Sequence, residues 1–417
     1  MSNVLLPTTG TAGDVHPFIA LGLGLKERGL RPRLIANEHF RELITGMGLD
    51  FIPMGTKAGY QQMIANPNLW HPSRGFQALV NDSIGPTVKP LYDLIAQYDP
   101  ADTLVVAPGV LYGARIAYEK LGMPWITVHL QPALFRTAYD TPPLGSAVFP
   151  PWLSPSAKRF LFRLMDKLLI DRAIGAKVNP VRQALGLRPQ AGFFAGSYHA
   201  PLKSLGLFPD WFAPPQPDWP PQVELTGFIQ FDGGEQASLS PTLQTFLDQG
   251  EPPLAFTMGT AMQHGAAFFR VSVAAAQTLN RRAILLTRHR EQLPPALPES
   301  IIAVDYAPFS QLLPQVALLV HHGGIGTVAQ ALAAGIPQLV HPLAHDQPDN
   351  ARRLARLGVG ATLTPSAYQE KKVVATLHRL LTDAAVARSC AKWAQRVDFA
   401  AALQKSCTAI ASVANRK

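Results

Sequence analysis

The chain has 417 residues, of which 47% are hydrophobic and 16% are charged, and its formal net charge is +9. This length and apolar content predict two or three domains with cores of their own, which excludes disorder as the main state of the chain. The charge would suit an anionic partner, but no run of Lys and Arg exceeds two residues, so nucleic-acid binding is not expected and a basic, solvated surface is the simpler interpretation.

Short apolar runs alternate with helical patterns over the first 130 residues. A predicted strand at Val4–Leu6 is followed by a Gly/Thr-rich loop to Gly13 and by a helix from about Pro17 to Arg28. Further strands are predicted at 33–36, 51–53, 103–107 and 125–128, with helices at 38–47 and 111–121. Such alternation predicts a parallel sheet with helices on both faces.

Proline dominates the middle of the chain. Residues 141–155 are rich in proline, and one or two helices are predicted over 156–185. The segment 208–221, FPDWFAPPQPDWPP, holds six prolines and two tryptophans. Proline at that density does not lie in a helix interior or a central strand, so the segment is predicted to be a stiff linker.

The alternation resumes after this segment, with strands at 254–257, 283–287, 301–304, 317–320 and 338–341 and helices near 266–280, 325–334, 347–357 and 366–382. The predicted fold class is therefore α/β, with two Rossmann-like parallel-sheet domains facing a cleft. The predicted parts are an N-terminal domain at 1–207, the linker at 208–221, a C-terminal domain at 222–384, and C-terminal helices at 385–417 that pack back on the N-terminal domain.

Two observations bear on the compartment. No apolar run approaches the roughly 20 residues of a membrane-spanning helix, and the start of the chain lacks the basic and apolar segments of a signal peptide. The two cysteines, Cys390 and Cys407, are too few for a disulfide framework or a cysteine-rich zinc site. We therefore expect a cytoplasmic protein.

The most informative segment is residues 320–351, VHHGGIGTVAQALAAGIPQLVHPLAHDQPDNA. A strand ends at the His pair, two glycines follow, and a helix begins around Ile325 to Thr327. Glycines let a ligand approach the backbone, and the first amides of a helix have no internal partner, so the pattern is typical of a diphosphate-binding loop. His322 and Thr327 would add hydrogen bonds to phosphate oxygens. Asp346 and Gln347, after the next strand, would suit a ligand with several hydroxyl groups.

Plainer interpretations remain open. A glycine pair before a helix is often a packing device. The four histidines in this segment could instead bind a metal, although their spacing matches no standard zinc pattern; they are His321, His322, His341 and His345. No Asp-x-Asp motif is present, and we expect neither a metal nor a cofactor.

Several segments resemble a known family. HHGGIGT, AAGIPQ and HDQPDNA resemble the donor-binding signature of family 1 glycosyltransferases, which are inverting nucleotide-sugar enzymes of the GT-B fold. GTAGDVHPFIALGLGLKERG resembles the opening of the acceptor domain in the bacterial and sterol branch. LWHPSRGF, GARIAYEKLGMPW, LFPDWFAPPQPDWP and TGFIQFDG are similar in particular to RhlB-type rhamnosyltransferases. The resemblance extends through most of the chain.

The resemblance implies a donor and an acceptor. The nucleotide sugar would be a co-substrate, with dTDP-rhamnose favoured and UDP-glucose second. The acceptor would be a hydroxyalkanoyl lipid, or else another lipid, a polyketide or a flavonoid-like compound. Loose attraction to a membrane that carries the acceptor, at the inner membrane, would account for part of the net charge. The sequence does not indicate an oligomeric state.

The resemblance also implies roles for single residues. The diphosphate would be held by Gly259, Thr260, His322, Gly323, Gly324, Gly326 and Thr327. The nucleoside would be held by Tyr306, Ala307, Pro308, Phe309 and Gln330, and the donor sugar by Asp346 and Gln347. Tyr306 stands where many relatives have Trp. Gln330 stands where plant relatives have a Glu that grips both ribose hydroxyls, which favours a deoxyribose donor.

The same resemblance implies that Asp14, after the first strand and a glycine turn, is the general base that deprotonates the acceptor. His16 is the competing base, and the structural alternative makes Asp14 a helix N-cap ahead of Pro17. The reaction would be a single in-line displacement in which negative charge grows on the leaving diphosphate.

Acceptor selection is expected in the loops at 55–75 and 130–155, although ordinary packing is an equally good interpretation of each apolar residue there. These residues are Tyr60, Met63, Trp70, Phe76, Phe135, Tyr139, Phe149 and Trp152. Two other classes of protein remain open. A nucleotide-sugar 2-epimerase would need acid and base groups around the sugar, and a non-catalytic nucleotide-sugar-binding protein would lack the base.

Overall fold

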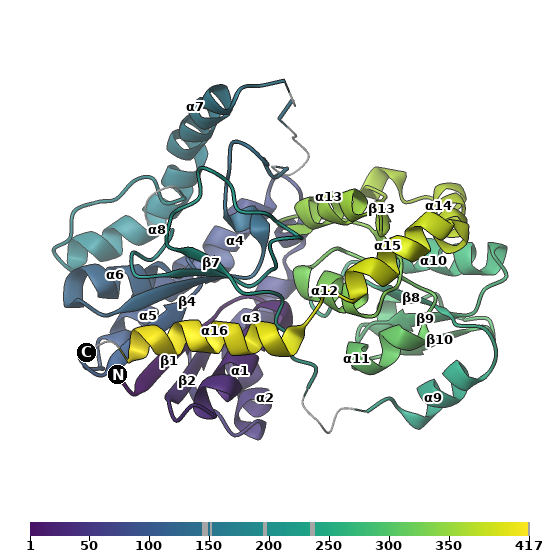
Figure 1. The fold of residues 1–417 in the computed structure, drawn as a ribbon, viewed down its shortest axis with the longest axis horizontal. Coiled ribbons are helices and arrows are strands. Elements are labelled where there is room, and N and C mark those ends of the chain that lie inside the picture. The colour runs from purple at the N-terminus through teal and green to yellow at the C-terminus, as the bar shows by residue number, and fades with distance from the viewer. Residues whose placement is uncertain (144–148, 151, 195–197, 234–237, 416–417) are drawn as a thin grey trace. The chain divides into compact units, whose positions relative to one another are not determined.

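The computed structural model describes residues 1–143, 149–150, 152–194, 198–233 and 238–415. The chain forms two compact units, one of residues 1–229 together with 399–417 and one of residues 230–398. Each unit is built on its own parallel sheet, with helices packed against it (Figure 1). The predicted α/β class with two parallel-sheet domains is confirmed.

The first sheet changes direction at β1, which pairs with β2 on one side and with β4 on the other. The chain runs outward from β1 to β3 and then returns to place β4 against β1. The loops that follow β1 and β4 therefore diverge, which makes this the topological switch point of the sheet. In sheet order the strands are β3 (Asp50–Pro53), β2 (Arg31–Ala36), β1 (Asn3–Pro7), β4 (Thr103–Ala107), β5 (Trp125–His129), β6 (Ser204–Gly206) and β7 (Val223–Leu225).

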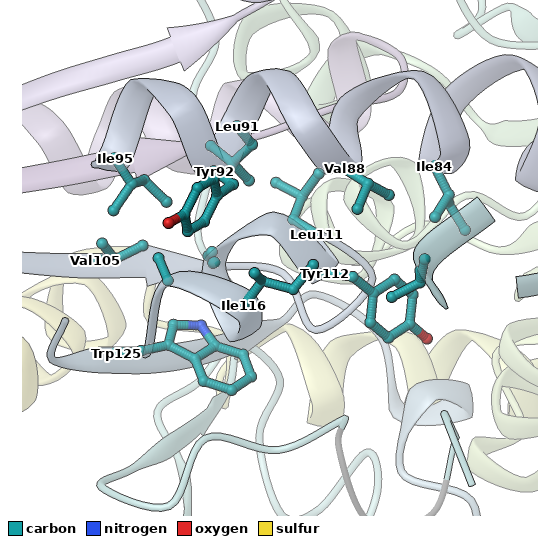
Figure 2. Close-up of a cluster of buried hydrophobic side chains, with 14 of the residues drawn as sticks. Ile84, Val88, Leu91, Tyr92, Ile95, Val105, Leu111, Tyr112, Ile116 and Trp125 are labelled. Carbon is teal, nitrogen blue, oxygen red and sulfur yellow. The ribbon is translucent and has the colours of Figure 1, made fainter. Parts of the chain in front are cut away.

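One face of this sheet is covered by helices that pack closely on each other. Trp125 of β5 and Tyr112 of α6 are fully buried in the cluster that α5 and α6 form with the sheet (Figure 2). Gly113 allows the two helices to approach, because a Cβ atom there would lie only 2.6 Å from the carbonyl oxygen of Val88. The α-helices of this unit are α1 (Ala12–Lys26), α2 (Arg41–Gly46), α3 (Lys57–Ala65), α4 (Gly75–Leu79), α5 (Gly85–Ile95), α6 (Tyr112–Leu121), α7 (Pro155–Met165), α8 (Asp171–Ala184) and α16 (Phe399–Ala414).

The last helix returns to the first unit, where α16, yellow in Figure 1, packs along α1. A Cβ atom at Gly24 of α1 would lie 2.8 Å from Sγ of Cys407, so the small residue permits the contact. The amino group of Met1 also donates to the carbonyl oxygen of Ala414 at 2.8 Å. The two ends of the described chain therefore lie together in the first unit.

The second sheet repeats the same topology. β8 lies between β9 and β11, so its switch point falls between β8 and β11. The strands in sheet order are β10 (Ile301–Val304), β9 (Ala283–Leu286), β8 (Leu254–Thr257), β11 (Leu318–His321), β12 (Gln338–Val340) and β13 (Gly360–Thr362). The α-helices are α9 (Pro241–Asp248), α10 (Ala266–Thr278), α11 (Phe309–Leu312), α12 (Ile325–Ala333), α13 (Gln347–Leu357), α14 (Glu370–Thr382) and α15 (Ala384–Ala394).

The first helix differs from its prediction. It begins at Ala12, five residues before the predicted start at Pro17. The carboxylate of Asp14 accepts a hydrogen bond from the backbone amide of Thr11, which satisfies the N-cap as in a capping box and starts the helix early. The helix then continues through Pro17. Asp14 and His16 therefore lie on the helix and not in the loop before it.

The predicted linker is a packed part of the first unit. Residues 208–221 come before β7, and the chain passes between the units at residues 229–230. Phe208 and Phe212 are buried, and the ring of Trp219 lies 4.8 Å from that of Phe135. The prolines fix the backbone of this segment while its aromatic side chains anchor it.

The predicted helical segment at 156–185 is one nearly continuous helix with a π-helical turn at Asp166–Ile170 between α7 and α8. Over the described residues, no helix combines the length and the apolar character needed to span a membrane.

Candidate functional site

Asp14 in the first unit and Gly259 and His322 in the second follow strands at the two switch points, where open α/β sheets bind ligands. The residues implied for the donor belong to the second unit and those implied for the base belong to the first. Each group is described within its own unit.

In the second unit, the imidazole of His322 fits against two glycines. A Cβ atom at Gly259, in the loop after β8, would lie 2.8 Å from Cε1 of His322, and one at Gly324 would lie 2.6 Å from Nε2. The two loops meet because Thr257 and His321 are paired across β8 and β11. Nδ1 of His322 is buried and has no hydrogen-bond partner among the described residues. This ring nitrogen could therefore form a hydrogen bond with a ligand.

Burial, with a smaller effect of the nearby His341, lowers the pKa of His322 to about 4. The side chain is therefore neutral near pH 7, and one of its ring nitrogens carries a hydrogen that can be donated.

The neighbouring His321 has a structural role. Its Nδ1 accepts from the backbone amide of Gly323 at 3.1 Å, so the hydrogen is on Nε2, which lies 3.0 Å from Oε1 of Gln338. Burial lowers its pKa to about 3. His341 is similarly engaged, with Nδ1 3.1 Å from the carbonyl oxygen of Leu363. Over the described residues there is no cluster of three or more His, Cys, Asp or Glu side chains suited to a metal.

The amides at the start of α12 are oriented for an anion. The first bond of the helix runs from the amide of Val328 to the carbonyl oxygen of Gly324, and no side chain of the described residues caps the helix. The amides of Ile325, Gly326 and Thr327 thus precede the helical ladder. A Cβ atom at Gly326 would meet nothing within 4 Å, so the space beside this turn is open.

Gly323 and Thr260 differ in the hydrogen-bonding groups that they leave available to a ligand. The amide of Gly323 is used by His321, and its φ of +99° is a conformation that glycine adopts without strain, so this residue shapes the loop. Thr260 is exposed after Gly259, whose amide donates to Oγ1 of Thr257 at 3.1 Å.

Asn350, which the sequence analysis missed, connects the Gly-rich loop to the start of α13. Its Nδ2 lies 2.9 Å from the carbonyl oxygen of Gly323 and 2.7 Å from Oδ2 of Asp346. It lies in the HDQPDNA segment, four residues after Asp346, and the spacing of one helical turn was the available signal.

Gln347 is buried, and its Oε1 accepts from the amides of Leu343 and Ala344 at 2.7 and 3.2 Å. The oxygen therefore supports the loop after β12. His345 in that loop has a φ of +60°, which is a strained conformation for a residue with a side chain.

The predicted nucleoside residues are arranged around the start of α11. Tyr306 is 46% exposed with the guanidinium of Arg288 5.8 Å from its ring centre, whereas Ala307 and Pro308 are buried. Asp232 accepts from the amides of Phe309 and Ser310 at 3.2 and 2.7 Å and so fixes this turn.

On α12, Oε1 of Gln330 accepts from Nε2 of Gln230 at 3.1 Å. Gln230 and Asp232 both come from the quoted segment TGFIQFDG, but their contacts with α12 and α11 could not be read from the sequence.

In the first unit, Asp14 lies beside the loop that follows β1. Its Oδ2 accepts from the amide and the hydroxyl of Thr11 at 2.8 and 3.2 Å. A Cβ atom at Gly10 would lie 2.3 Å from the same oxygen. Burial raises the pKa of the Asp14 carboxyl to about 6, although the bonds from Thr11 lower it. Asp14 thus supports the helix start and also has the raised pKa that suits a base near neutral pH. His16 lies two residues further along the same helix.

The residues predicted for acceptor selection divide into three groups, of which one, Trp70, Phe76 and Phe149, is partly buried. Tyr60, Met63 and Phe135 are buried, and Tyr60 stacks on His39 with the ring centres 4.2 Å apart, so these three belong to the core. Tyr139 and Trp152 are 46% and 81% exposed.

Comparison with known proteins identifies the family. Residues 4–139 match the glycosyltransferase family 28 N-terminal domain, and residues 272–409 match the C-terminal domain of erythromycin biosynthesis protein CIII-like proteins. The chain is 30% identical over 436 aligned residues to the O-mycaminosyltylonolide 6-deoxyallosyltransferase of Streptomyces fradiae, which covers 98% of this chain and 96% of that protein. The chain belongs to the GT-B superfamily of nucleotide-sugar glycosyltransferases.

Solved structures show the same fold at lower sequence identity. The glycosyltransferase of kitacinnamycin aligns over 99% of this chain and 98% of its own, with a TM-score of 0.75 and 18% identity. The spinosyn rhamnosyltransferase SpnG, solved with thymidine diphosphate, aligns over 100% of both chains, with a TM-score of 0.65 and 19% identity. The GT-B glycosyltransferase fold predicted from the sequence is therefore confirmed.

The partly buried carboxylate of Asp14 predicts how stability depends on pH. A folded-state pKa of about 6, above the usual 3.8, means that the folded protein binds this proton more tightly than the unfolded chain. The contribution of Asp14 to stability therefore falls as the pH rises from 3.8 to about 6 and is constant above that range. Asp14→Asn should be more stable than the parent protein near pH 8, by on the order of 1 to 3 kcal/mol.

Urea unfolding across this pH range measures the effect, and the difference should shrink as the pH falls toward 4. The exposed Asp210, changed to Asn, is the matched control and should show no such trend. A pH-independent loss of stability in Asp14→Asn would contradict the assignment.

Proposed function

We propose that this chain is an inverting glycosyltransferase that transfers a deoxyhexose from dTDP-rhamnose to a hydroxyl group of a hydrophobic acceptor, such as a hydroxyalkanoyl lipid. One observation supports the proposed binding of the donor diphosphate. A neutral His322 with an unpartnered, buried Nδ1 lies beside Gly324, which begins the open first turn of α12. Neutral donors and a helix N-terminus suit a diphosphate, which accepts hydrogen bonds and carries negative charge.

The leaving group is stabilised by the same atoms. As the bond between the anomeric carbon and the diphosphate oxygen breaks, negative charge grows on the diphosphate. The amides of Ile325, Gly326 and Thr327 precede the hydrogen bonds of α12, and the ring of His322 lies against Gly324, so these groups would need little reorganisation. Gly259 and Gly324 hold the ring in place, and Thr260 adds an exposed hydroxyl in the loop after β8.

The acceptor is activated by Asp14 in this proposal. The carboxylate takes the proton of the acceptor hydroxyl, and the resulting oxygen nucleophile attacks the anomeric carbon from the face opposite the diphosphate, so the configuration inverts. A pKa of about 6 leaves Asp14 mostly ionised near neutral pH and more basic than an ordinary carboxylate. His16 is the alternative base.

The proposed preference for a thymidine nucleotide depends on Gln330. Its Oε1 is engaged by Gln230, which leaves its amide nitrogen as the group that can meet a hydroxyl. An amide whose oxygen is already engaged cannot accept from both hydroxyls of a ribose as a carboxylate does, so this position suits a deoxyribose better. Tyr306 and Phe309 would contact the base, and Asp346 and Gln347 would bind the donor sugar, Gln347 through its amide nitrogen. SpnG, which was solved with thymidine diphosphate, supports a thymidine donor by likeness of fold.

The acceptor class is supported by a relative. The protein from Streptomyces fradiae is named for transfer of a 6-deoxyhexose to O-mycaminosyltylonolide. A hydrophobic acceptor also fits the exposed Tyr139 and Trp152 in the first unit. Incubation with dTDP-rhamnose or UDP-glucose and a panel of hydroxyalkanoyl lipids, polyketides and flavonoids tests this part, with free nucleotide diphosphate and a mass-shifted product as the readout. Transfer only from UDP-glucose would overturn the proposed donor.

His322→Ala should weaken binding of thymidine diphosphate, measured by isothermal titration calorimetry, by at least tenfold, since hydrogen bonds to charged groups are worth about 1.5 to 3 kcal/mol. The exposed His378 of α14, changed to Ala, is the matched control in the same unit and should bind as the parent protein does. Equal affinity of His322→Ala and the parent would place the diphosphate elsewhere.

Asp14→Asn should lower the rate of sugar transfer by about 10²- to 10⁴-fold while leaving thymidine diphosphate affinity unchanged. In the parent protein, kcat/KM should rise with pH through about 6, as the carboxylate loses its proton, and then level off. His16→Gln is the comparison variant. If it loses transfer and Asp14→Asn keeps it, His16 is the base.

Gln330→Glu should shift nucleotide preference toward uridine diphosphate, because a carboxylate can accept from both hydroxyls of a ribose. The ratio of the two dissociation constants, measured for parent and variant by calorimetry, checks this. An unchanged ratio would show that Gln330 does not contact the sugar of the nucleoside.

A further inference from the structure

The exposed apolar side chains of the protein gather on one helix. Among the described residues, nine large apolar side chains are exposed, and six of them lie within residues 152–169. They are Trp152, Phe160, Leu161, Leu164, Leu168 and Leu169. Five of the six lie on α7 and the π-helical turn that follows, and α7 projects from the rest of the first unit (Figure 1).

The side chains of this helix form four rows, each repeating every fourth residue, as neighbours on one helix face do. One row is buried, one is basic and exposed, and two are apolar and largely exposed. The buried row is Lys158, Phe162, Asp166 and Ile170, and the basic row is Arg159, Arg163 and Lys167. The first apolar row is Phe160, Leu164 and Leu168. The second apolar row is Leu161, Met165 and Leu169.

The buried row attaches the helix firmly to the first unit. The guanidinium of Arg136 pairs with the carboxylate of Asp166 at 2.5 Å and lies 4.7 Å from the ring centre of Phe162. Phe162 also contacts Phe149, with ring centres 5.3 Å apart. The helix therefore already has its core face, and the two apolar rows form a second face whose side chains are exposed, except for Met165, which is partly buried against the core of the first unit. We call these two rows, with Trp152, the apolar face.

The exposed charges within residues 152–170 are all basic. Arg159, Arg163 and Lys167 lie between the buried row and the apolar face and are exposed. The only acidic residue in 152–170 is Asp166, which is buried and paired with Arg136. A second copy of the chain docked on this face would bring another basic row against the first, whereas anionic lipid headgroups would neutralise it.

We propose that α7 and its π-helical turn form a docking surface for an anionic lipid bilayer. The apolar face enters the boundary between headgroups and acyl chains, with the exposed indole of Trp152 at the level of the headgroups, and the basic row binds lipid phosphates. The helix lies in the plane of the interface and does not cross the bilayer. This surface is independent of the proposed donor site, which belongs to the second unit.

Vesicle flotation tests the proposal with the full chain. The protein should float with vesicles of phosphatidylcholine containing phosphatidylglycerol and remain largely unbound with phosphatidylcholine alone. Phe160→Gln combined with Leu169→Gln changes the two most exposed large apolar side chains of the helix, 60% and 62%, and should lower partitioning by on the order of tenfold or more. Gln is a good helix former, so the helix should persist.

The basic row has its own variant. Arg163→Gln combined with Lys167→Gln should weaken partitioning by about 30-fold. Each cation contributes about 1 kcal/mol to membrane binding, and each 1.4 kcal/mol changes partitioning about tenfold. Two matched controls should float as the parent does: Leu202→Gln, which removes an apolar side chain that is 45% exposed, and Lys371→Gln with Lys372→Gln on α14.

All variants should bind thymidine diphosphate as the parent does, so failure of this proposal is separate from failure of the proposed function. Two results would overturn it: equal flotation of the parent and the Phe160/Leu169 variant, or light scattering that shows a dimer in the parent and a monomer in that variant without vesicle binding. The second result would make the apolar face an interface between copies of the chain.

Discussion

The candidate donor site depends on one close contact, that of the His322 ring with two glycines. Pairing of Thr257 with His321 brings the loops after β8 and β11 together, and neither Gly259 nor Gly324 could carry a side chain without displacing the ring. His321 then fixes Gly323, and Asn350 joins Gly323 to Asp346 on the next helix. Binding groups from three loops are thus placed by backbone geometry and buried hydrogen bonds, which is how a site avoids reorganisation when charge develops on a ligand.

In the first unit, the carboxylate of Asp14 has two roles. It satisfies the start of α1 through Thr11, and it is held in surroundings that raise its pKa to about 6. A group that costs stability when ionised is expected where reactivity is required. The capping interpretation and the catalytic interpretation of Asp14 are therefore compatible, since the bond from Thr11 also orients the carboxylate.

Much of the fold follows from the sequence, because buried parallel strands produce apolar runs and glycines mark the loops between strand and helix. The Gly-rich loop of 320–327 was predictable on these grounds. The engagement of Gln347 with its own loop, the contact of Gln230 with Gln330, and the packing of Phe208 and Phe212 were not, because each depends on which residues tertiary structure brings together. A first-turn proline at Pro17 predicts a later start of α1 than the structure shows, because the capping box begins the helix at Ala12.

The proposed binding of the donor diphosphate by His322, held between the glycines, is tested most directly by Gly324→Ala. The φ of −62° and ψ of 140° at Gly324 suit alanine, so the new Cβ strains no backbone but displaces the imidazole it would approach to 2.6 Å. Gly46→Ala, where a Cβ meets nothing within 4 Å, is the control. Calorimetric titration with thymidine diphosphate should show a loss of affinity on the order of tenfold for Gly324→Ala and none for Gly46→Ala. Unchanged affinity in Gly324→Ala would contradict the account.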